Sequence, residues 1–486
     1  MKKNIKFILI TLLLVAILSV ALVGCAKKPN LTGGMPEATT YNNNSLVVTQ
    51  GDYVYFVNGK ISVDDIATKK DNKYGNVVKS AIYRAKKDGS DVQVLVPQVA
   101  MDSNNSNGIT VIGKYLYFTS PSTATGKDGS LLKTNTDFYR VEITGKNLKK
   151  LTTLEGNTNQ YKFTEEGLIY LESSNLIHLS YKGKKTTIAE SVSNSYFPVT
   201  TTVKPGETDP TMAVYFTESP EENDGDPYNV IKCVTASGEV KEILSGKDGA
   251  FNYSIKSVER EGDTANPATE ATIYYEKTEY DNGQNTNLGL FGFKVNKEFA
   301  KSADEKQFAN SGATVRYISY DEGLYVFADN EMYIPVIENG IAKKGDKVYS
   351  LRKSDTTSVA ATDIFTIRQE GDKKAMYFFD SNSLLKVEFN DDGTLGLAEE
   401  LIEANIVTDY VKPILDGDKF YYINSAYYNY MYVVDFSAED VKHTLFGTRT
   451  DADKTAYIQY VKGLDEDNRA DHDALIKEDL PATDFE

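Results

Sequence analysis

The chain has 486 residues, with 53 Lys and Arg against 70 Asp and Glu, 33 Tyr, three His, two Cys and no Trp. Its net charge of −17 repels phosphate backbones and anionic lipid surfaces, which argues against nucleic acid as a partner. With so few His and Cys, a histidine-based triad or a zinc site has almost no residues to draw on.

The N-terminal segment predicts a secretory signal. Three lysines among the first six residues precede an uncharged apolar run, 7–23, which is short for a membrane-spanning helix. The run leads into a motif that resembles the lipobox of bacterial lipoproteins: Leu22, Val23, Gly24 and Cys25. That resemblance implies cleavage before Cys25 and diacylglycerol on its thiol, which anchors the chain at the extracellular face of the cell membrane. An uncleaved anchor, or an ordinary signal with a chance Cys, are the alternatives.

Composition divides the chain into four parts. Residues 1–24 form the signal peptide, 25–44 the lipidated Cys and a flexible tether, 45–447 a β domain, and 448–486 an acidic, mostly disordered tail. Within that tail, 455–464 could add an edge strand. Removing the three signal lysines leaves 50 basic against 70 acidic residues, so the mature chain has a net charge near −20.

A β-rich unit recurs eight times in the β domain. One Tyr marks each copy: Tyr55, Tyr117, Tyr170, Tyr215, Tyr274, Tyr325, Tyr377 and Tyr421. Successive markers are 44 to 62 residues apart. Each copy reads as strand, tight turn, strand, variable connection, strand, turn and strand, and Gly occupies the turns because they require positive φ.

Such a unit cannot bury both of its faces alone. Radial stacking of antiparallel four-stranded sheets covers them, so the repeats predict an all-β chain folded as a β-propeller. Eight blades match the count. Seven stay open because the fifth copy, 288–305, is degenerate, and a linear β-solenoid, with shorter repeats and parallel strands, is the rival architecture.

The first repeat also supports a family resemblance. Its "AIYRAKKDGSDVQVLV" (81–96) resembles the blade signature of the low-density-lipoprotein-receptor-type (YWTD-like) β-propellers. The resemblance covers most of 45–447 and implies a propeller at the cell surface; bacterial members are secreted lipoproteins, largely of unknown function. The Trp-Asp pair of the receptor motif is missing, with "YVYF" and "YLYF" in its place, so no ligand is carried over.

The connection between the second and third strands varies most. By our spacing count it is long after Tyr55, Tyr117, Tyr215 and Tyr325, and short after Tyr170 and Tyr377. These connections share one rim of a propeller, where repeat proteins build binding surfaces. We predict a recognition rim on 57–80, 119–137, 217–229 and 276–287. Its candidate residues are Lys60, Asp64, Asp65, Tyr74, Lys127, Asp128, Glu221, Asp224, Asp226, Tyr228, Tyr280 and Asp281. Alternatively, long polar loops are simply tolerated at low entropic cost.

Motifs for catalysis or cofactors are weak. "GITVIGKY" (108–115) spells most of a P-loop, but Tyr115 replaces the Ser/Thr and the segment predicts a hairpin. His178 and His443 fit hydrogen-bonded strand positions, His472 lies in the tail, and Cys233 fits a small buried filler without a disulfide partner. The carboxylate clusters 221–227, 390–393 and 465–473 do not follow the EF-hand pattern, so calcium is unsupported. We therefore predict no catalytic, cofactor or metal site.

The sequence predicts a surface-anchored lipoprotein whose propeller is a non-catalytic binding or scaffolding module for an extracellular protein or polymer. The alternative is an extracellular enzyme acting on glycans or peptides, with acidic residues around the propeller channel. Convergent Asp and Glu with shifted pKa values at the channel would favour that alternative. A sensor-like accessory to an envelope or export machine is a third possibility.

Overall fold

The computed structural model describes residues 39–448 with gaps, together with Thr455, Gln459, Lys462 and Gly463. The gaps are 41–44, 61–78, 101–107, 123, 131, 133, 156–160, 165–166, 201–211, 221–225, 236–237, 261–270, 297, 311–314, 321–322, 329–330, 339–340, 393, 404, 409–411, 428 and 439–442. The predicted signal and lipobox lie outside the described residues. Within the described part of the chain, no helix has the length and hydrophobicity needed to traverse a bilayer.

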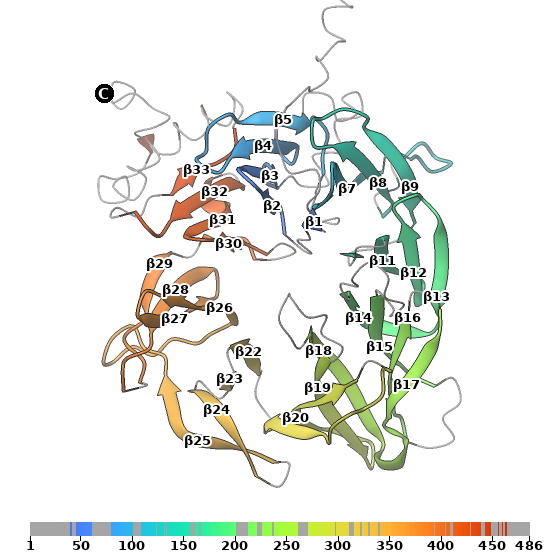
Figure 1. Ribbon diagram of the computed structural model, residues 1–486, viewed down its shortest axis with the longest axis vertical. Helices are drawn as coiled ribbons and strands as arrows, with labels where there is room; N and C mark the ends of the chain where they lie inside the picture. Colours follow the sequence, from blue (N-terminus) through green and yellow to red (C-terminus); the bar gives the residue numbers. More distant parts are fainter. Residues whose placement is uncertain are drawn as a thin grey trace, which may run out of the picture.

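The described strands form eight antiparallel sheets around a central axis, which confirms an eight-bladed β-propeller (Figure 1). Each blade takes four strands that are consecutive in the sequence. Blade 1 comprises β2 (Val47–Gln50), β3 (Tyr53–Val57), β4 (Ile82–Lys86) and β5 (Gln93–Val96). Blade 2 comprises β6 (Thr110–Ile112), β7 (Tyr115–Pro121), β8 (Thr136–Glu142) and β9 (Lys149–Leu154). Blades 3 and 4 comprise β10 (Tyr161–Phe163), β11 (Gly167–Glu172), β12 (Asn175–Ser180), β13 (Lys185–Ala189), and β14 (Val192–Thr200), β15 (Met212–Glu218), β16 (Val230–Thr235), β17 (Val240–Ser245).

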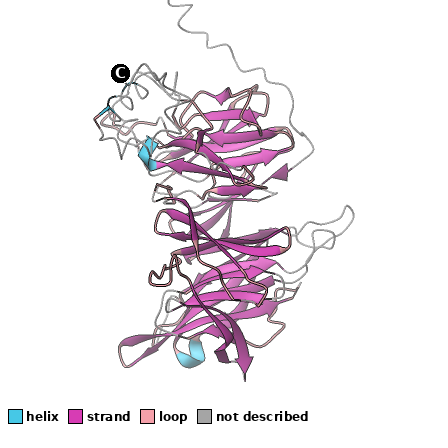
Figure 2. Ribbon diagram, turned by 90° about the vertical axis from the view of Figure 1, so that its left-hand side faces the viewer, coloured by secondary structure: helices cyan, strands magenta, loops and turns pink. Residues whose placement is uncertain are grey.

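The remaining four blades follow the same order. Blades 5 and 6 comprise β18 (Phe251–Arg260), β19 (Ala271–Asp281), β20 (Gln284–Val295), β21 (Lys306–Ala309), and β22 (Arg316–Tyr320), β23 (Gly323–Ala328), β24 (Glu331–Glu338), β25 (Ile341–Ser350). Blades 7 and 8 comprise β26 (Asp363–Glu370), β27 (Lys373–Asp380), β28 (Ser383–Glu388), β29 (Glu399–Ile402), and β30 (Ile414–Asp416), β31 (Lys419–Asn424), β32 (Tyr430–Asp435), β33 (Thr444–Leu445). Seen edge-on, strands dominate, with short helical turns at Lys247–Gly249 and Ser425–Tyr427 (Figure 2).

Glycine fixes the first turn of several blades. In blade 8, Asp416 pairs with Lys419, so Gly417 and Asp418 form a two-residue hairpin turn in which Gly417 has φ of 61°. Gly51, Gly113 and Gly371 occupy the equivalent position with φ between 56° and 63°. Because a residue with a Cβ is strained at this positive φ, the turn glycines set the register of the strands that follow.

The marker tyrosines are core residues. All eight lie in the second strand of a blade, and none is more than 8% exposed. The buried side chains form seven clusters among the described residues, and each cluster joins neighbouring blades. Cys233 lies in such a cluster as a free, fully buried thiol whose pKa burial raises to about 12, which confirms its role as an apolar filler.

A short N-terminal strand changes one blade. β1 (Thr39–Thr40) falls within the segment predicted as a tether, and it pairs with β6 at the inner edge of blade 2. The backbone N–H of Ile109 donates to the carbonyl of Ser45 at 3.2 Å, which holds the chain after β1 against the same blade. The tether therefore reaches the propeller at its inner edge, where β1 covers a strand edge that faces the channel.

Two local predictions differ from the structure. The connection after Tyr325, predicted to be long, is short, because β24 follows β23 directly, and Tyr349 lies in the fourth strand β25. The alternating apolar residues of β24 are separated by Pro335, which obscured the strand in the sequence. In the segment 455–464, the described residues Thr455, Gln459 and Lys462 have helical rather than extended backbone.

Candidate functional site

The second-to-third-strand connections share one face of the propeller. In each antiparallel meander the first and third turns leave one end of the blade, and the middle connection leaves the other. Those of blades 1 and 8 touch, since the backbone N–H of Lys60 donates to the carbonyl of Asn429 at 2.9 Å. The predicted rim thus corresponds to one face of the propeller, although it is not a continuous belt of loops.

In blade 2 the rim carries a rigid, exposed loop. Asp128 accepts hydrogen bonds from the backbone and hydroxyl of Ser130 at 3.0 and 2.7 Å, which lower the pKa of its carboxyl. The neighbouring Lys127 is also exposed. In blade 4, Asp226 is exposed and Tyr228 half-buried, so four candidate residues lie at the surface of this face. Asp64, Asp65, Tyr74, Glu221 and Asp224 lie outside the described residues.

In blade 5 the predicted rim loop is instead a β ribbon. Residues 276–287 form no irregular loop, because β19 and β20 continue as a long ribbon that turns at Asn282 and Gly283. Tyr280 is a strand residue opposite Asn285, and its backbone N–H donates to Ala250. Asp281 is exposed at the tip. The polar composition of the segment reflects a solvent-exposed ribbon, which alternation alone does not distinguish from a loop.

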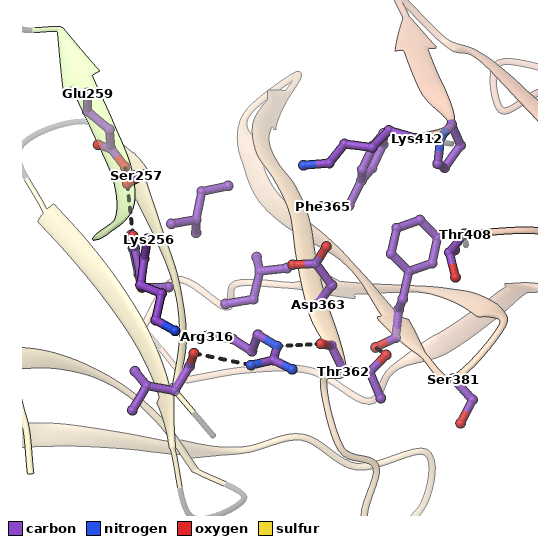
Figure 3. A pocket seen from close by; sticks show the side chains of 16 residues that line it. Lys256, Ser257, Glu259, Arg316, Thr362, Asp363, Phe365, Ser381, Thr408 and Lys412 are labelled. Atoms are coloured by element: carbon purple, nitrogen blue, oxygen red, sulfur yellow. Dashed lines mark hydrogen bonds between the residues drawn. The ribbon is translucent and has the colours of Figure 1, made fainter. Parts of the chain in front are cut away.

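A cavity of about 770 Å³ opens on the channel side of the ring (Figure 3). Inner strands of three consecutive blades, β18, β22 and β26, supply most of its wall, and the segment before β30 completes it. This volume is in the usual range of small-molecule sites. The lining residues are Lys256, Ser257, Glu259, Val315, Arg316, Tyr317, Ile318, Thr362, Asp363, Ile364, Phe365, Phe379, Ser381, Thr408, Lys412 and Pro413.

Hydrogen bonds hold part of this wall in place. Arg316 Nε donates to the carbonyl of Thr362 at 2.5 Å, and Arg316 Nη1 to that of Val315 at 3.3 Å (Figure 3). The hydroxyl groups of Ser257 and Tyr317 are 2.8 Å apart, so β18 and β22 are joined inside the cavity. These bonds fix the guanidinium group while its Nη2 makes no hydrogen bond within the described part of the chain.

The charges in the cavity are mixed. Lys256 is paired with Glu276 at 2.8 Å, whereas Lys412 forms no ion pair with any described residue. Asp363 is exposed as a residue, yet the cavity wall around its carboxyl partly desolvates that group and raises its pKa, which the charges of Lys412 and Arg316 in turn lower. Glu259 accepts a hydrogen bond from Ser257 at 3.3 Å.

A further lysine faces the same channel. Lys162 lies on β10, the inner strand of blade 3, and forms no ion pair among the described residues. Burial, and secondly the positive charge of Lys412, lower the pKa of Lys162. The two ammonium groups therefore repel each other across the channel although they belong to blades that are not neighbours.

Basic residues in the first strands of several repeats could have indicated this cavity. Our predicted rim includes none of its lining residues, yet basic residues stand in or beside first strands in "YKF", "SIKS", "VRYIS" and "VKPIL". Because first strands line the channel of a propeller, these positions mark charges that face the channel. What the sequence does not give is where along the channel the side chains leave a cavity.

The histidines and carboxylate clusters singled out in the sequence lie partly within the described residues. No group of three or more His, Cys, Asp or Glu side chains there is arranged to hold a metal ion. The "NDDG" segment is a turn as expected, since Asp392 accepts from the backbone and hydroxyl of Thr394. Both strand histidines were predicted to be hydrogen-bonded. This is confirmed for His443, whose Nδ1 lies 2.5 Å from the hydroxyl of Tyr422. It is wrong for the buried Nε2 of His178, which has no partner in the described chain.

No family model matches the chain, and no curated protein matches its sequence. Among solved structures, the periplasmic gluconolactonase PpgL of Pseudomonas aeruginosa is 11% identical over 82% of this chain and 98% of that one, with a TM-score of 0.35. An oligogalacturonate lyase in complex with manganese is 10% identical over 87% and 100%, with a TM-score of 0.36. Saccharomyces cerevisiae Sqt1 is 12% identical over 68% and 81%, with a TM-score of 0.37. Likeness at this level carries no inference about activity.

Proposed function

We propose that this chain is a bacterial lipoprotein, anchored at the outer face of the cell membrane through Cys25, whose propeller binds an extracellular protein or polymer without reacting with it. The observation that carries the proposal is the rim. The middle connections of the blades share one face, and the blade 2 loop there presents the exposed Lys127 and Asp128 on a rigid turn. Preformed polar loops on a rigid scaffold are the usual form of a recognition surface.

The anchor is compatible with that role. Thirteen residues separate Cys25 from β1, and a chain of that length spans at most roughly 45 Å. Diacylglycerol supplies two acyl chains, which hold a protein at a bilayer stably where one chain does not. The propeller would therefore be kept close to the membrane while its loops meet molecules of the cell envelope or the medium.

Loop replacement tests the proposal. Residues 122–135 are exchanged for the two-residue turn Ser173–Ser174 that joins β11 to β12, and 61–78 for a short Gly linker. The partner of the wild-type protein is identified by crosslinking on intact cells, and we expect the variant to lose it while its melting temperature stays close to wild type. The matched control carries Lys146→Ser and Lys184→Ser on turns of the opposite face and should keep the partner. Undiminished crosslinking by a folded loop variant would refute the proposal.

One observation favours a second candidate, an enzyme acting on glycans or peptides. Asp363 and Glu259 both line the channel cavity, and the pKa of Asp363 is raised, as expected of a general acid. However, the two residues come from β26 and β18, and the inner strand of a whole blade, β22, stands between them. We rank this candidate second. It predicts turnover of an extracellular saccharide or peptide that Asp363→Asn abolishes.

A further inference from the structure

The channel cavity contains cationic groups that form no ion pair within the described part of the chain. Elsewhere in this acidic protein, several half-buried lysines are paired with carboxylates, among them Lys232 with Glu218 at 2.6 Å and Lys277 with Glu305 at 2.8 Å. Lys412 and Arg316, by contrast, form no ion pair with the described residues. Arg316 is half-buried, and a half-buried cation without an ion pair in a concave site is available to an anionic ligand, whereas Lys412 is exposed and lines the same cavity.

The remaining wall adds hydrogen-bonding and apolar surface. Asp363 and the hydroxyls of Thr408 and Ser381 lie on the blade 7 and 8 side of the cavity, and Figure 3 shows Lys412 extending over the same side. Phe365 and Phe379, whose ring centroids are 5.5 Å apart, supply an apolar patch between them. A carboxylate such as Asp363 accepts hydrogen bonds from ligand hydroxyls, and an aromatic patch packs against the C–H face of a sugar ring.

We propose that this cavity binds an anionic saccharide, whose carboxylate or phosphate is held by Arg316 and Lys412 and whose hydroxyl groups are bound by Asp363. The free Nη2 of Arg316 donates to the anion, since Nε and Nη1 are already held by Thr362 and Val315. Lys162 adds a positive potential from the far side of the channel. The site contains none of the candidate rim residues, although Ser381 lies in the second-to-third-strand connection of blade 7.

The proposal accounts for the charge distribution. Lys256 is neutralised by Glu276, and Glu259 stands at the opposite end of the cavity with Ser257. Around Asp363, two cations thus face one carboxylate, and Lys162 makes a third across the channel. In a chain with a net charge of −17, this local excess of positive charge would attract an anion that the outer surface repels.

Isothermal titration calorimetry of the full propeller tests the site, with glucuronate, glucose 6-phosphate, glucose and inorganic phosphate as probes. We expect at least one of the two anionic sugars to bind, and to bind more tightly than glucose or inorganic phosphate. Comparing the affinities for glucuronate and glucose 6-phosphate shows whether the site prefers a carboxylate or a phosphate. Lys412→Gln should weaken that binding by at least about tenfold, because it removes a charge-assisted hydrogen bond.

Lys149→Gln is the matched control, since it removes the same charge from an exposed residue of the outer strand β9 and should leave affinity unchanged. Asp363→Asn should weaken the anionic sugar but not inorganic phosphate. Both lysines and Asp363 are exposed, so folding is readily checked by melting temperature. The proposal is overturned if neither anionic sugar binds, if glucose or inorganic phosphate binds equally well, or if Lys412→Gln and Lys149→Gln have the same effect.

Discussion

The side-chain amide of Asn58 donates a hydrogen bond to the carbonyl of Thr448 at 2.9 Å, although the two residues are 390 positions apart. The hydroxyl of Thr448 in turn donates to that of Tyr83 at 3.1 Å. The last described residues of the propeller thus lie against its first blade. Because each blade uses its own four strands, contacts between blades 8 and 1, including the backbone hydrogen bond from Lys60 to Asn429, rather than an exchanged strand close the ring.

Phe446 should be the most sensitive residue of this closure. It is 2% exposed, and its ring centroid lies 4.9 Å from that of Phe56 and 5.1 Å from that of Tyr421. Phe446→Ala is expected to lower the free energy of unfolding by about 3–5 kcal/mol. Leu397→Ala, at a residue 57% exposed, is the control and should change it by less than about 0.5 kcal/mol. Urea denaturation compares them, and equal midpoints would count against this closure.

The turn at Gly417 gives a prediction about backbone conformation. Its φ of 61° strains any residue with a Cβ, although a Cβ there would meet no other atom within 4 Å. We expect Gly417→Ala to cost about 1–2 kcal/mol of stability. Gly396 has no such φ and would place its Cβ at an ordinary 3.6 Å from the Glu388 carbonyl, so Gly396→Ala should be neutral. Chemical denaturation of both variants measures the difference, and a neutral Gly417→Ala would show that the turn relaxes.

Stability should depend on pH through Glu370. Burial alone would raise the pKa of its carboxyl, but hydrogen bonds from Lys386, Tyr377 and Arg368 hold it at about 2, below its ordinary 4.5. The carboxylate therefore stabilises the fold fully above about pH 4.5, and this contribution is lost as the pH falls toward 2. We expect Glu370→Gln to cost about 1–3 kcal/mol at pH 7 and progressively less in acid.

Urea midpoints of wild type and Glu370→Gln, measured from pH 7 down to pH 2.5, test this. The exposed Glu399 on the outer strand of the same blade supplies the control, and Glu399→Gln should show no such pH dependence. A difference between wild type and Glu370→Gln that stays constant over the whole range would mean that the charge of Glu370 does not stabilise the fold.

The anchor can be tested through the two cysteines. We expect the wild-type protein to sediment with membranes, to start at Cys25 and to carry the mass of diacylglycerol. Cys25→Ala should abolish that mass and release the protein or leave its precursor uncleaved. Cys233→Ala, which alters the buried thiol of blade 4, should leave anchoring unchanged. Mass spectrometry of the membrane fraction decides, and an unmodified Cys25 in membrane-bound wild type would contradict lipidation.

The fold was predictable because its signals are local and repeated. Turn glycines such as Gly113 and buried markers such as Tyr117 recur in every clear copy, and radial stacking follows from their number. The predictions that differ from the structure concern β24 with its Pro335 and the β19–β20 ribbon, where residue patterns of strand and loop are alike. The cavity could not be predicted, because the repeat pattern places β18, β22 and β26 in neighbouring blades but does not show where their side chains leave space along the channel.

The central claim, that the rim is the recognition face, is tested most directly by site-specific photocrosslinking on intact cells. A photoreactive residue replaces Asp128 on the rim or Lys146 on the opposite face, both of which are exposed turn residues of blade 2. Our account predicts that position 128 crosslinks a defined extracellular partner and that position 146 does not. Equal crosslinking from both positions, or a partner captured from position 146 alone, would contradict it.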